Sequence, residues 1–488
     1  MKKNLTKFSL LMTTVMIFAL LCLSFLTITP TVGVQTTIEL WYVDDDSIDD
    51  TLLSLIDEFE QEKGVTINAT RLSRDEAKEL YQTASLAGKA PDIIEGPTTW
   101  IPEFVTKGYI LPLTAEDLNE DYMSEALREV SYYEFDYDAS QIIGNSIVYY
   151  GFPYRLDVQA FVYNVPKAVQ AIIPSTSLSW DMDQFITEIT KVNDQSNPAN
   201  KIYGFSYGEF PWSVEPLFFG HNGTKFADYI VDVAHSKIMD EDSTSALEYI
   251  YNFTNVLRLT PNYKEDYDKA SDLVSMIAAD TYEGFANQGD TISTFAFSSE
   301  IKHILEGSQF TEDSNLGFGP TPSMEGATGA PLYAYAFMLN RELTGATKTT
   351  AIELAQKLTS TTAMTSNANN EYLMPAIIGA YSGAIINEYK NLLSSITINP
   401  ISKYWEATQA VLKTEIGSML YGNQNGSTTA KALDVKYKFV VPETENNPPI
   451  LPAAPTIISP TPWAFETSIL VLVLSTILII YYRKKKKW

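Results

Sequence analysis

The sequence predicts an α/β protein whose globular part lies between two hydrophobic terminal segments. Segments with the patterns of strands and helices alternate over most of the 488 residues, which is typical of an α/β sheet protein. Hydrophobic residues make up 45% of the chain and charged residues 19%, so the chain can bury a large core. The longest apolar runs lie at the two ends, as targeting and membrane segments do. At ordinary domain sizes this length corresponds to about two or three domains.

The N-terminal segment, residues 1–33, has the order of a secretory signal. Three lysines within the first seven residues precede an apolar run over residues 8–26, and small residues follow it. We expect cleavage near Gly33; because the apolar run is long, an uncleaved signal anchor is the alternative. Cys22, the only cysteine, lies inside the run and is not preceded by the small residue of a lipoprotein signal. We therefore expect no lipid anchor, disulfide or thiolate metal site.

The C-terminal end has the features of a membrane anchor. Residues 463–482 are predominantly apolar, and 20 helical residues rise about 30 Å, enough to cross the hydrocarbon core. Residues 483–488 form a basic tail, which indicates the cytoplasmic side. Residues 442–462 contain seven prolines and predict an extended stalk. We expect a single-pass cell-membrane protein with its main domain, residues 34–441, outside the cell; a buried core helix at 463–482 is the alternative.

The charge balance limits the partners of this extracellular part. Eight of the 34 basic residues lie in the terminal segments but only one of the 60 acidic residues does, so the part between them carries a net charge of −33. Phosphate binding needs a basic face, so we expect no nucleic-acid partner. Such a surface also repels anionic lipid headgroups, which fits a domain that stands off the membrane.

The extracellular part opens with a βαβαβ pattern. Its segments are strands at residues 37–43, 65–69 and 91–94, and helices at 48–59 and 75–87. Gly64 and Gly88 follow the two helices, where glycine commonly ends a helix. This pattern predicts an open, mostly parallel sheet. Later strands are predicted at 147–152, 159–163, 203–206, 291–296 and 334–339, and helices at 181–192, 245–257 and 349–358.

Seven motifs in order carry a family resemblance. They are the opening strand that ends at Trp41, FEQEKGVTI (59–67), GKAPDII (88–94), FVTKGYILPL (104–113), FPYRLDVQAFVYN (152–164), FANQGDT (285–291) and GFGPTP (317–322). With these motifs the sequence resembles the extracellular solute-binding proteins of ABC importers, in the branch that includes the maltose/maltodextrin-binding proteins. The resemblance covers about residues 37–441.

The resemblance implies a two-lobed periplasmic-binding-protein-like (type II) fold, in which ligand lies in a cleft and the lobes close around it at a hinge. Lobe one is expected to hold about residues 37–154 and 337–371, and lobe two about 157–332 and 374–441. Independently of the family, ligands of open parallel sheets bind beyond the carboxyl ends of the strands.

Four residues match sugar-contacting positions of the resembling family. Asp45 and Asp157 match acidic sugar ligands, while Trp212 and Trp405 match aromatic platforms. A pyranose has an apolar face for a flat ring and a rim of hydroxyls for carboxylates, so such a site needs both residue types. An acidic turn or helix cap is the alternative role for Asp45, and core packing is the alternative for the tryptophans.

Three further residues are secondary candidates for ligand contacts. These are Trp100, Glu209 and Tyr404. Trp100 lies where the family motif of tryptophan, acid and arginine is not preserved residue for residue, so its ring is displaced along the chain. Residues 297–299 replace another tryptophan position of the family. These departures leave the identity of the ligand open.

Two motifs of common enzymes are absent. The sequence has no HExxH or GxxxxGK motif, and its one GxSxG match is GFSYG at residues 204–208. We expect neither enzymatic activity nor a cofactor or bound metal. A glycoside hydrolase needs only two facing carboxylates and remains an alternative.

The resemblance implies a subunit that captures a carbohydrate such as maltodextrin and delivers it to an ABC permease with a separate ATPase. The C-terminal segment predicts that this subunit is anchored, and we expect a monomer, with the oligomeric state left open. The alternatives are a sensor or adhesin without a transporter, and a binder of peptides or other small solutes. Glycosylation is a further hypothesis at Asn68, Asn222, Asn252 and Asn425, which begin Asn-x-Ser/Thr sequences.

Overall fold

The computed structural model describes most of the extracellular part of the chain. The described residues are 36–43, 49–118, 142–143, 146–147, 149–197, 200–207, 214–222, 241–261, 283–310, 315–323, 330–393, 396–398 and 404–440. The predicted signal, stalk, membrane helix and basic tail lie outside these residues. Among the helices in the described ranges, none is long and apolar enough to cross a membrane.

The N-terminal strands and helices confirm the βαβαβ prediction. Strand β1 (Thr37–Val43) pairs in parallel with β2 (Thr66–Leu72) and β3 (Ile93–Pro97), and helices α2 (Asp49–Lys63) and α3 (Arg74–Leu86) connect them. Gly64 and Gly88 have positive φ angles of 66° and 63°, which glycine adopts without steric cost. Both glycines therefore end their helices as predicted.

Two long strands connect this unit to the rest of the molecule. Strand β6 (Phe152–Asn164) pairs with β11 (Ala330–Leu339) in antiparallel orientation, and β11 continues alongside β3. The other half of β6 pairs with β8 (Ser293–Phe297) and β9 (Leu316–Gly319). Strand β12 (Met374–Pro375) lies at the edge beside β6, and β13 (Ile396–Ile398) pairs with β11.

The prediction of a mostly parallel sheet is wrong for most pairings beyond the first three strands, although β13 pairs with β11 in parallel. In the described part of the sheet, β6 pairs with β11, β12, β8 and β9 in antiparallel orientation only. The reason is that β6 and β11 run in opposite directions through the middle of the molecule, so strands from both halves add to them. Local periodicity indicates that a segment forms a strand, but it does not determine which strand that segment pairs with.

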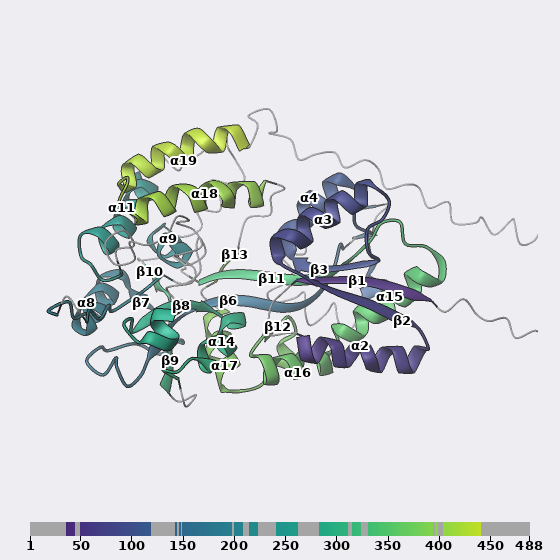
Figure 1. Ribbon diagram of the computed structural model, residues 1–488, viewed down its shortest axis with the longest axis horizontal. Helices are drawn as coiled ribbons and strands as arrows, with labels where there is room; N and C mark the ends of the chain where they lie inside the picture. The colour runs from purple at the N-terminus through teal and green to yellow at the C-terminus, as the bar shows by residue number, and fades with distance from the viewer. Residues whose placement is uncertain are drawn as a thin grey trace, which may run out of the picture.

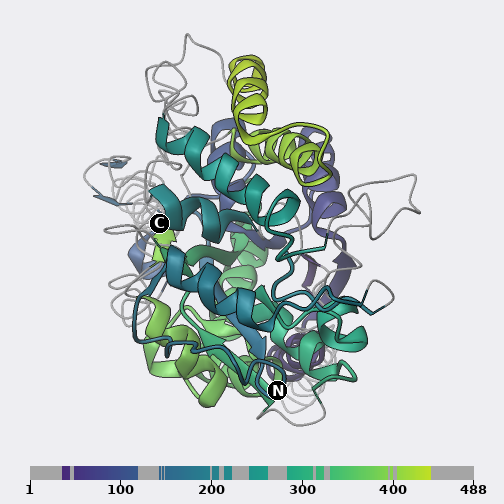
Figure 2. The same cartoon turned by 90° about the vertical axis from the view of Figure 1, so that its left-hand side faces the viewer.

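The buried residues form two large hydrophobic clusters. The first contains side chains of β1, β3, α2, α3 and α4 (Ile101–Lys107), the elements we call lobe one, and it extends along β6 and β11 to Phe285, Ile301 and Tyr389. The second contains side chains of α8 (Met182–Val192), α11 (Glu241–Asn255), α18 (Trp405–Leu420) and α19 (Gly426–Val440), which we call lobe two. Figures 1 and 2 show α11, α18 and α19 side by side, with α18 and α19 at the upper left of Figure 1 and α3 and α4 to their right.

The remaining elements are short or cover the sheet. The helices are η1 (Thr98–Trp100), α5 (Ala115–Leu118), α9 (Glu215–Asn222), η5 (Glu283–Gln288), η6 (Ser298–Glu300), α14 (Ile301–Glu306), α15 (Gly345–Leu358), α16 (Thr361–Glu371), η8 (Ile378–Ala380) and α17 (Ala384–Leu392). The strands are β4 (Ile142–Ile143), β5 (Ser146–Ile147), β7 (Trp180–Asp181) and β10 (Pro322–Ser323). The predicted helices over 181–192, 245–257 and 349–358 are therefore confirmed as α8, α11 and α15, within a few residues at their ends.

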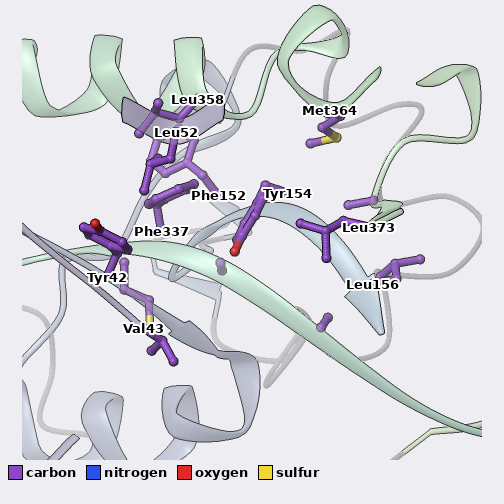
Figure 3. Packing of buried hydrophobic residues seen from close by; sticks show 14 of the residues in the cluster. Tyr42, Val43, Leu52, Phe152, Tyr154, Leu156, Phe337, Leu358, Met364 and Leu373 are labelled. Atoms are coloured by element: carbon purple, nitrogen blue, oxygen red, sulfur yellow. The ribbon is translucent and has the colours of Figure 1, made fainter. Parts of the chain in front are cut away.

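Two strand predictions need correction. The strand predicted at 147–152 is not a single strand, because β5 ends at Ile147 and β6 begins only at Phe152. The strand predicted at 159–163 is the second half of β6, in which nearly every side chain is buried. Residues 203–206 make only isolated bridges, Tyr203 to Thr291 and Ser206 to Thr294. The first residues of β6 lie in the lobe-one core, where the ring centroids of Tyr154 and Phe337 are 4.9 Å apart and the rings are tilted by 38° (Figure 3).

Candidate functional site

A buried carboxylate holds together the strand ends of lobe one. Glu95, in β3, is fully buried and accepts hydrogen bonds from the backbone N–H of Val43 and the hydroxyl of Tyr154, each at 2.8 Å. Val43 is the last residue of β1, and Tyr154 lies in β6. Glu95 therefore fixes the carboxyl ends of two parallel strands relative to β6, at the edge where ligands of such sheets bind.

Trp100 lies directly after this edge and is fully buried. It ends the short helix η1, and its ring packs against Gly96 and against the ring of Phe104 at 5.9 Å. Gly96 is required there, because a β-carbon would overlap the indole. The indole Nε1 has no hydrogen-bond acceptor among the described residues. The predicted ligand contact of Trp100 stays a prediction.

Asp157, in the middle of β6, is buried and extensively hydrogen-bonded. Its Oδ1 accepts from Ser298 Oγ at 2.9 Å and from the backbone N–H of Ser299 at 3.1 Å, and its Oδ2 accepts from Ser299 Oγ at 2.7 Å. These serines stand where the resembling family has a tryptophan. The Asp157 carboxylate thus caps the short helix η6 from the neighbouring strand. The predicted contact between Asp157 and a ligand stays a prediction.

Arg155 and the rings of Tyr154 and Tyr335 lie near Asp157 on strands β6 and β11. The guanidinium of Arg155 lies 3.8 Å from the ring centroid of Tyr335 in β11 and 5.6 Å from that of Tyr154. Arg155 is almost completely buried. Stacking of a buried guanidinium on two rings stiffens the region where β6 and β11 cross from one lobe to the other.

Trp405 begins helix α18 in lobe two and is fully buried. Tyr404, the residue before it, is the N-cap position and is half-buried. Trp405 Nε1 has no acceptor within the described ranges, and one turn later Gln409 Oε1 has no donor there. Two polar atoms buried on one face of this helix thus have no hydrogen-bond partner among the described residues.

The buried carboxyl group of Glu215 is hydrogen-bonded to this face of α18 through Gln409. Glu215, the first residue of α9, accepts from Tyr333 Oη at 2.7 Å and from Gln409 Nε2 at 3.3 Å. Burial raises the pKa of Glu215 from its ordinary value of 4.5 to about 8, although both hydrogen bonds act in the opposite direction. The side chain is therefore largely protonated at neutral pH, and a buried negative charge is avoided.

The two lobes meet through Glu406, which follows Trp405. Its Oε1 accepts from Arg74 Nη2 and from Thr99 Oγ1, both at 2.9 Å. Arg74 begins α3, and Thr99 lies in η1 next to Trp100. A carboxylate of lobe two thus bonds to two donors of lobe one.

Sequence reasoning placed some of these residues and missed others. Asp45, Glu209 and Trp212 lie outside the described residues, so their predicted contacts stay predictions. The structure places Trp100 and Trp405 one residue from Thr99 and Glu406, which bond to each other, so the two predicted tryptophans lie at the same junction of the lobes. Glu406 and Gln409 come from the same helix as Trp405, whereas the remaining residues of the junction are supplied by distant parts of the chain: Arg74, Glu215 and Tyr333. Only the position of Glu406 beside Trp405 offered a signal for these.

The junction brings aromatic and polar side chains of both lobes together. It combines buried indole rings with carboxylate, amide, guanidinium and hydroxyl groups. Aromatic faces fit the apolar faces of a ligand, and the polar groups fix its orientation. Among the described residues, no group of histidine, cysteine, aspartate and glutamate is arranged to hold a metal ion.

Comparison with known proteins places the chain in a family. A family model described as bacterial extracellular solute-binding protein matches residues 45–365. A sequence comparison with curated proteins finds no match.

Solved structures share the fold at low sequence identity. The GacH receptor of Streptomyces glaucescens, solved unliganded and with acarbose, has a TM-score of 0.66 and 15% identity, over 83% of this chain and 98% of that chain. An ABC substrate-binding protein of Listeria monocytogenes in complex with cycloalternan has a TM-score of 0.65 and 14% identity, over 83% and 98%. A maltose/maltodextrin-binding domain of Bdellovibrio bacteriovorus bound to maltotriose has a TM-score of 0.61 and 17% identity, over 83% and 99%.

Proposed function

The chain belongs to the bacterial extracellular solute-binding proteins, and from this premise we propose that it captures an oligosaccharide by closure of its two lobes. Several solved structures with the same fold are described as complexes with oligosaccharides such as maltotriose, which supports a carbohydrate of this class. The ligand leaves the site chemically unchanged.

The carbohydrate proposal rests on two buried polar atoms of α18, Trp405 Nε1 and Gln409 Oε1. Trp405 offers an indole N–H, and Gln409 on the same helix face offers an amide oxygen, and neither has a partner in the part of the chain that the structure describes. Buried polar groups are normally satisfied, so a ligand with hydroxyl groups is a suitable partner. An aromatic ring beside such groups suits the mixed surface of a pyranose.

Closure follows from contacts that the ligand makes with both lobes. A ligand that touches only one lobe shifts no equilibrium between open and closed forms, because it binds both forms equally. We propose that ligand bridges the side of Trp100 in lobe one and the side of Trp405 in lobe two. The strands β6 and β11, shared by both lobes, would then bend as the hinge.

Anchoring and delivery are the finer part of the proposal and rest on the sequence. The apolar residues 463–482, the basic tail and the proline-rich residues 442–462 support a tethered domain outside the cell membrane. A tether keeps the domain at a high local concentration beside a membrane partner. We propose that this partner is an ABC permease served by an ATPase on another chain.

A thermal-shift screen of the full-length chain tests the carbohydrate proposal. Maltodextrins, other oligosaccharides, polyols and short peptides would be added in turn, because a ligand that binds only the folded state raises its stability. We expect a saturable shift with one class of oligosaccharide. A shift with peptides alone would contradict the carbohydrate assignment, and no shift with any of these compounds would favour a sensor or an adhesin.

Two conservative variants separate binding from folding. Trp405→Phe removes the indole N–H and part of the ring, and we expect it to weaken sugar binding about tenfold, which corresponds to about 1.4 kcal/mol. Trp180→Phe is the matched control, because Trp180 is also a buried tryptophan of lobe two but packs against Phe161 and Phe185 inside the core. Equal loss of affinity in both variants would refute a direct role of Trp405.

A further inference from the structure

The contact at Glu406 joins elements that belong to different lobes. Arg74 and Thr99 lie in lobe one, whereas Glu406 lies in the first turn of α18 in lobe two. The residues are separated by roughly 300 positions in the sequence, and Figure 1 shows the end of α18 next to α3 and α4. With both bonds at 2.9 Å, the contact can form only when the lobes are close together.

The ion pair is partly shielded from solvent, which strengthens it. The Arg74 and Glu406 side chains are 28% and 18% exposed, and Thr99 is buried. Burial alone would lower the pKa of the Arg74 guanidinium, but the Glu406 carboxylate, followed by Tyr335, Asp75 and Tyr333, raises it above its ordinary value. Pairs in such surroundings are less screened than pairs on an open surface.

The contact also fixes the two predicted tryptophans relative to each other. Thr99 directly precedes Trp100, and Glu406 directly follows Trp405. Both indoles are fully buried, so neither ring can shift without moving its neighbours. A bond between Thr99 and Glu406 therefore holds the backbone of η1 and the start of α18 at one separation.

From this geometry we infer that Glu406 is a positioning residue that stabilises the closed arrangement of the lobes before ligand binds. Ligand affinity then depends on the contact, because the apparent dissociation constant is the intrinsic one divided by the fraction of closed molecules. The link to ligand affinity rests on the proposed function. Closure in the absence of ligand does not rest on the proposed function, so an experiment can refute either claim without refuting the other.

The test measures the distance between the lobes in the full-length chain without ligand. Spin labels on cysteines introduced at Leu86 in α3 and Val435 in α19, which are 78% and 55% exposed, report lobe separation by pulsed electron paramagnetic resonance. Cys22 is replaced by serine in all samples, so that only the introduced cysteines react. We expect wild type to populate a short distance, and Glu406→Gln to lower the ratio of closed to open molecules about tenfold, equivalent to about 1.4 kcal/mol.

A charge reversal identifies the ion pair as the cause. Arg74→Glu and Glu406→Arg should each open the lobes, and the double variant should close them again, because the pair is restored with opposite polarity. Raising the salt concentration from about 0.05 to 0.5 M should open wild type but leave Glu406→Gln nearly unchanged. Circular dichroism checks that each variant is folded, and Glu406→Gln remains informative if a reversal variant is not.

Lys78→Met is the matched control. Lys78 and Glu103 form an ion pair at 2.8 Å with side chains 16% and 21% exposed, but α3 and α4 both belong to lobe one. This variant should leave the lobe distance and its salt dependence unchanged. The inference is overturned if Glu406→Gln has the distance distribution of wild type, if Lys78→Met opens the lobes equally, or if wild type without ligand shows only the open distance.

A separate titration connects closure to binding. If the thermal-shift screen identifies a sugar, its dissociation constant should rise about tenfold in Glu406→Gln and recover in the double reversal. An opened variant with unchanged affinity would refute the coupling while leaving the closure result intact. If no sugar binds, the distance measurements still decide whether Glu406 stabilises closure.

Discussion

Protonation of Glu215 makes the stability of the protein depend on pH. Its carboxyl group is buried at the start of α9, and burial raises its pKa to about 8 from an ordinary value of 4.5. A carboxyl group whose pKa is higher in the folded state binds its proton more tightly there. The resulting stability is fully present below the unfolded pKa and is lost as the pH rises through the folded pKa.

The size of the effect follows from the difference between the two pKa values. Between pH 5 and pH 7 the folded state holds the proton and the unfolded state has released it, so stability falls by about 1.36 kcal/mol per pH unit, or about 2.7 kcal/mol. Glu215→Gln keeps the shape of the side chain and removes the titration. Its amide oxygen accepts only one of the hydrogen bonds from Tyr333 and Gln409, which costs about 1 kcal/mol at every pH.

Urea unfolding of wild type and Glu215→Gln at pH 5 and pH 7 measures this difference. We expect the two proteins to be about equally stable at pH 5, and the variant to be more stable than wild type by about 2 kcal/mol at pH 7. Groups other than Glu215 that titrate in this range are common to both proteins, so the difference between the two curves isolates Glu215. Parallel curves for the two proteins across this range would refute a raised pKa at Glu215.

Three further predictions concern packing and charge. Gly96→Ala places a methyl group in the Trp100 ring and should destabilise the chain by about 1–3 kcal/mol, visible in urea unfolding together with a changed near-ultraviolet tryptophan signal. Asp157→Asn weakens the hydrogen bonds that cap η6 and should lower the free energy of unfolding by about 1–3 kcal/mol. An unchanged midpoint of urea unfolding would mean that these bonds do not stabilise the fold. Lys302→Met leaves Glu371, paired with it at 2.5 Å, buried without its cation and should cost about 3 kcal/mol, of which the double variant with Glu371→Gln should recover most.

The sequence determined local structure and family well. The alternating strand and helix patterns of residues 37–94 and the glycines at 64 and 88 were sufficient to place β1, α2, β2, α3 and β3. Such signals are local, because neighbouring residues determine where a helix ends and where a buried strand forms. The ordered motifs from Trp41 to residue 322 likewise identified the family that the family model matches.

The pairing of the strands was decided by tertiary structure. The first half of β6 pairs with β11 and β12, and its second half pairs with β8 and β9. The residue pattern of β6 alone does not predict these partners. The antiparallel neighbours arise because the chain passes between the lobes more than once, and contacts between distant segments are not encoded in local periodicity.

The same limit separates the predicted site residues from the observed junction. Trp405 and Asp157 could be named from their positions in motifs, but the partners of each side chain come from elsewhere in the chain. Glu406 became informative only when folding placed it against Arg74, and Glu215 only when burial beside Tyr333 raised its pKa. The sequence by itself determined which residue types are available for recognition, whereas burial and long-range contact, which exist only in the folded chain, decided what each of them does.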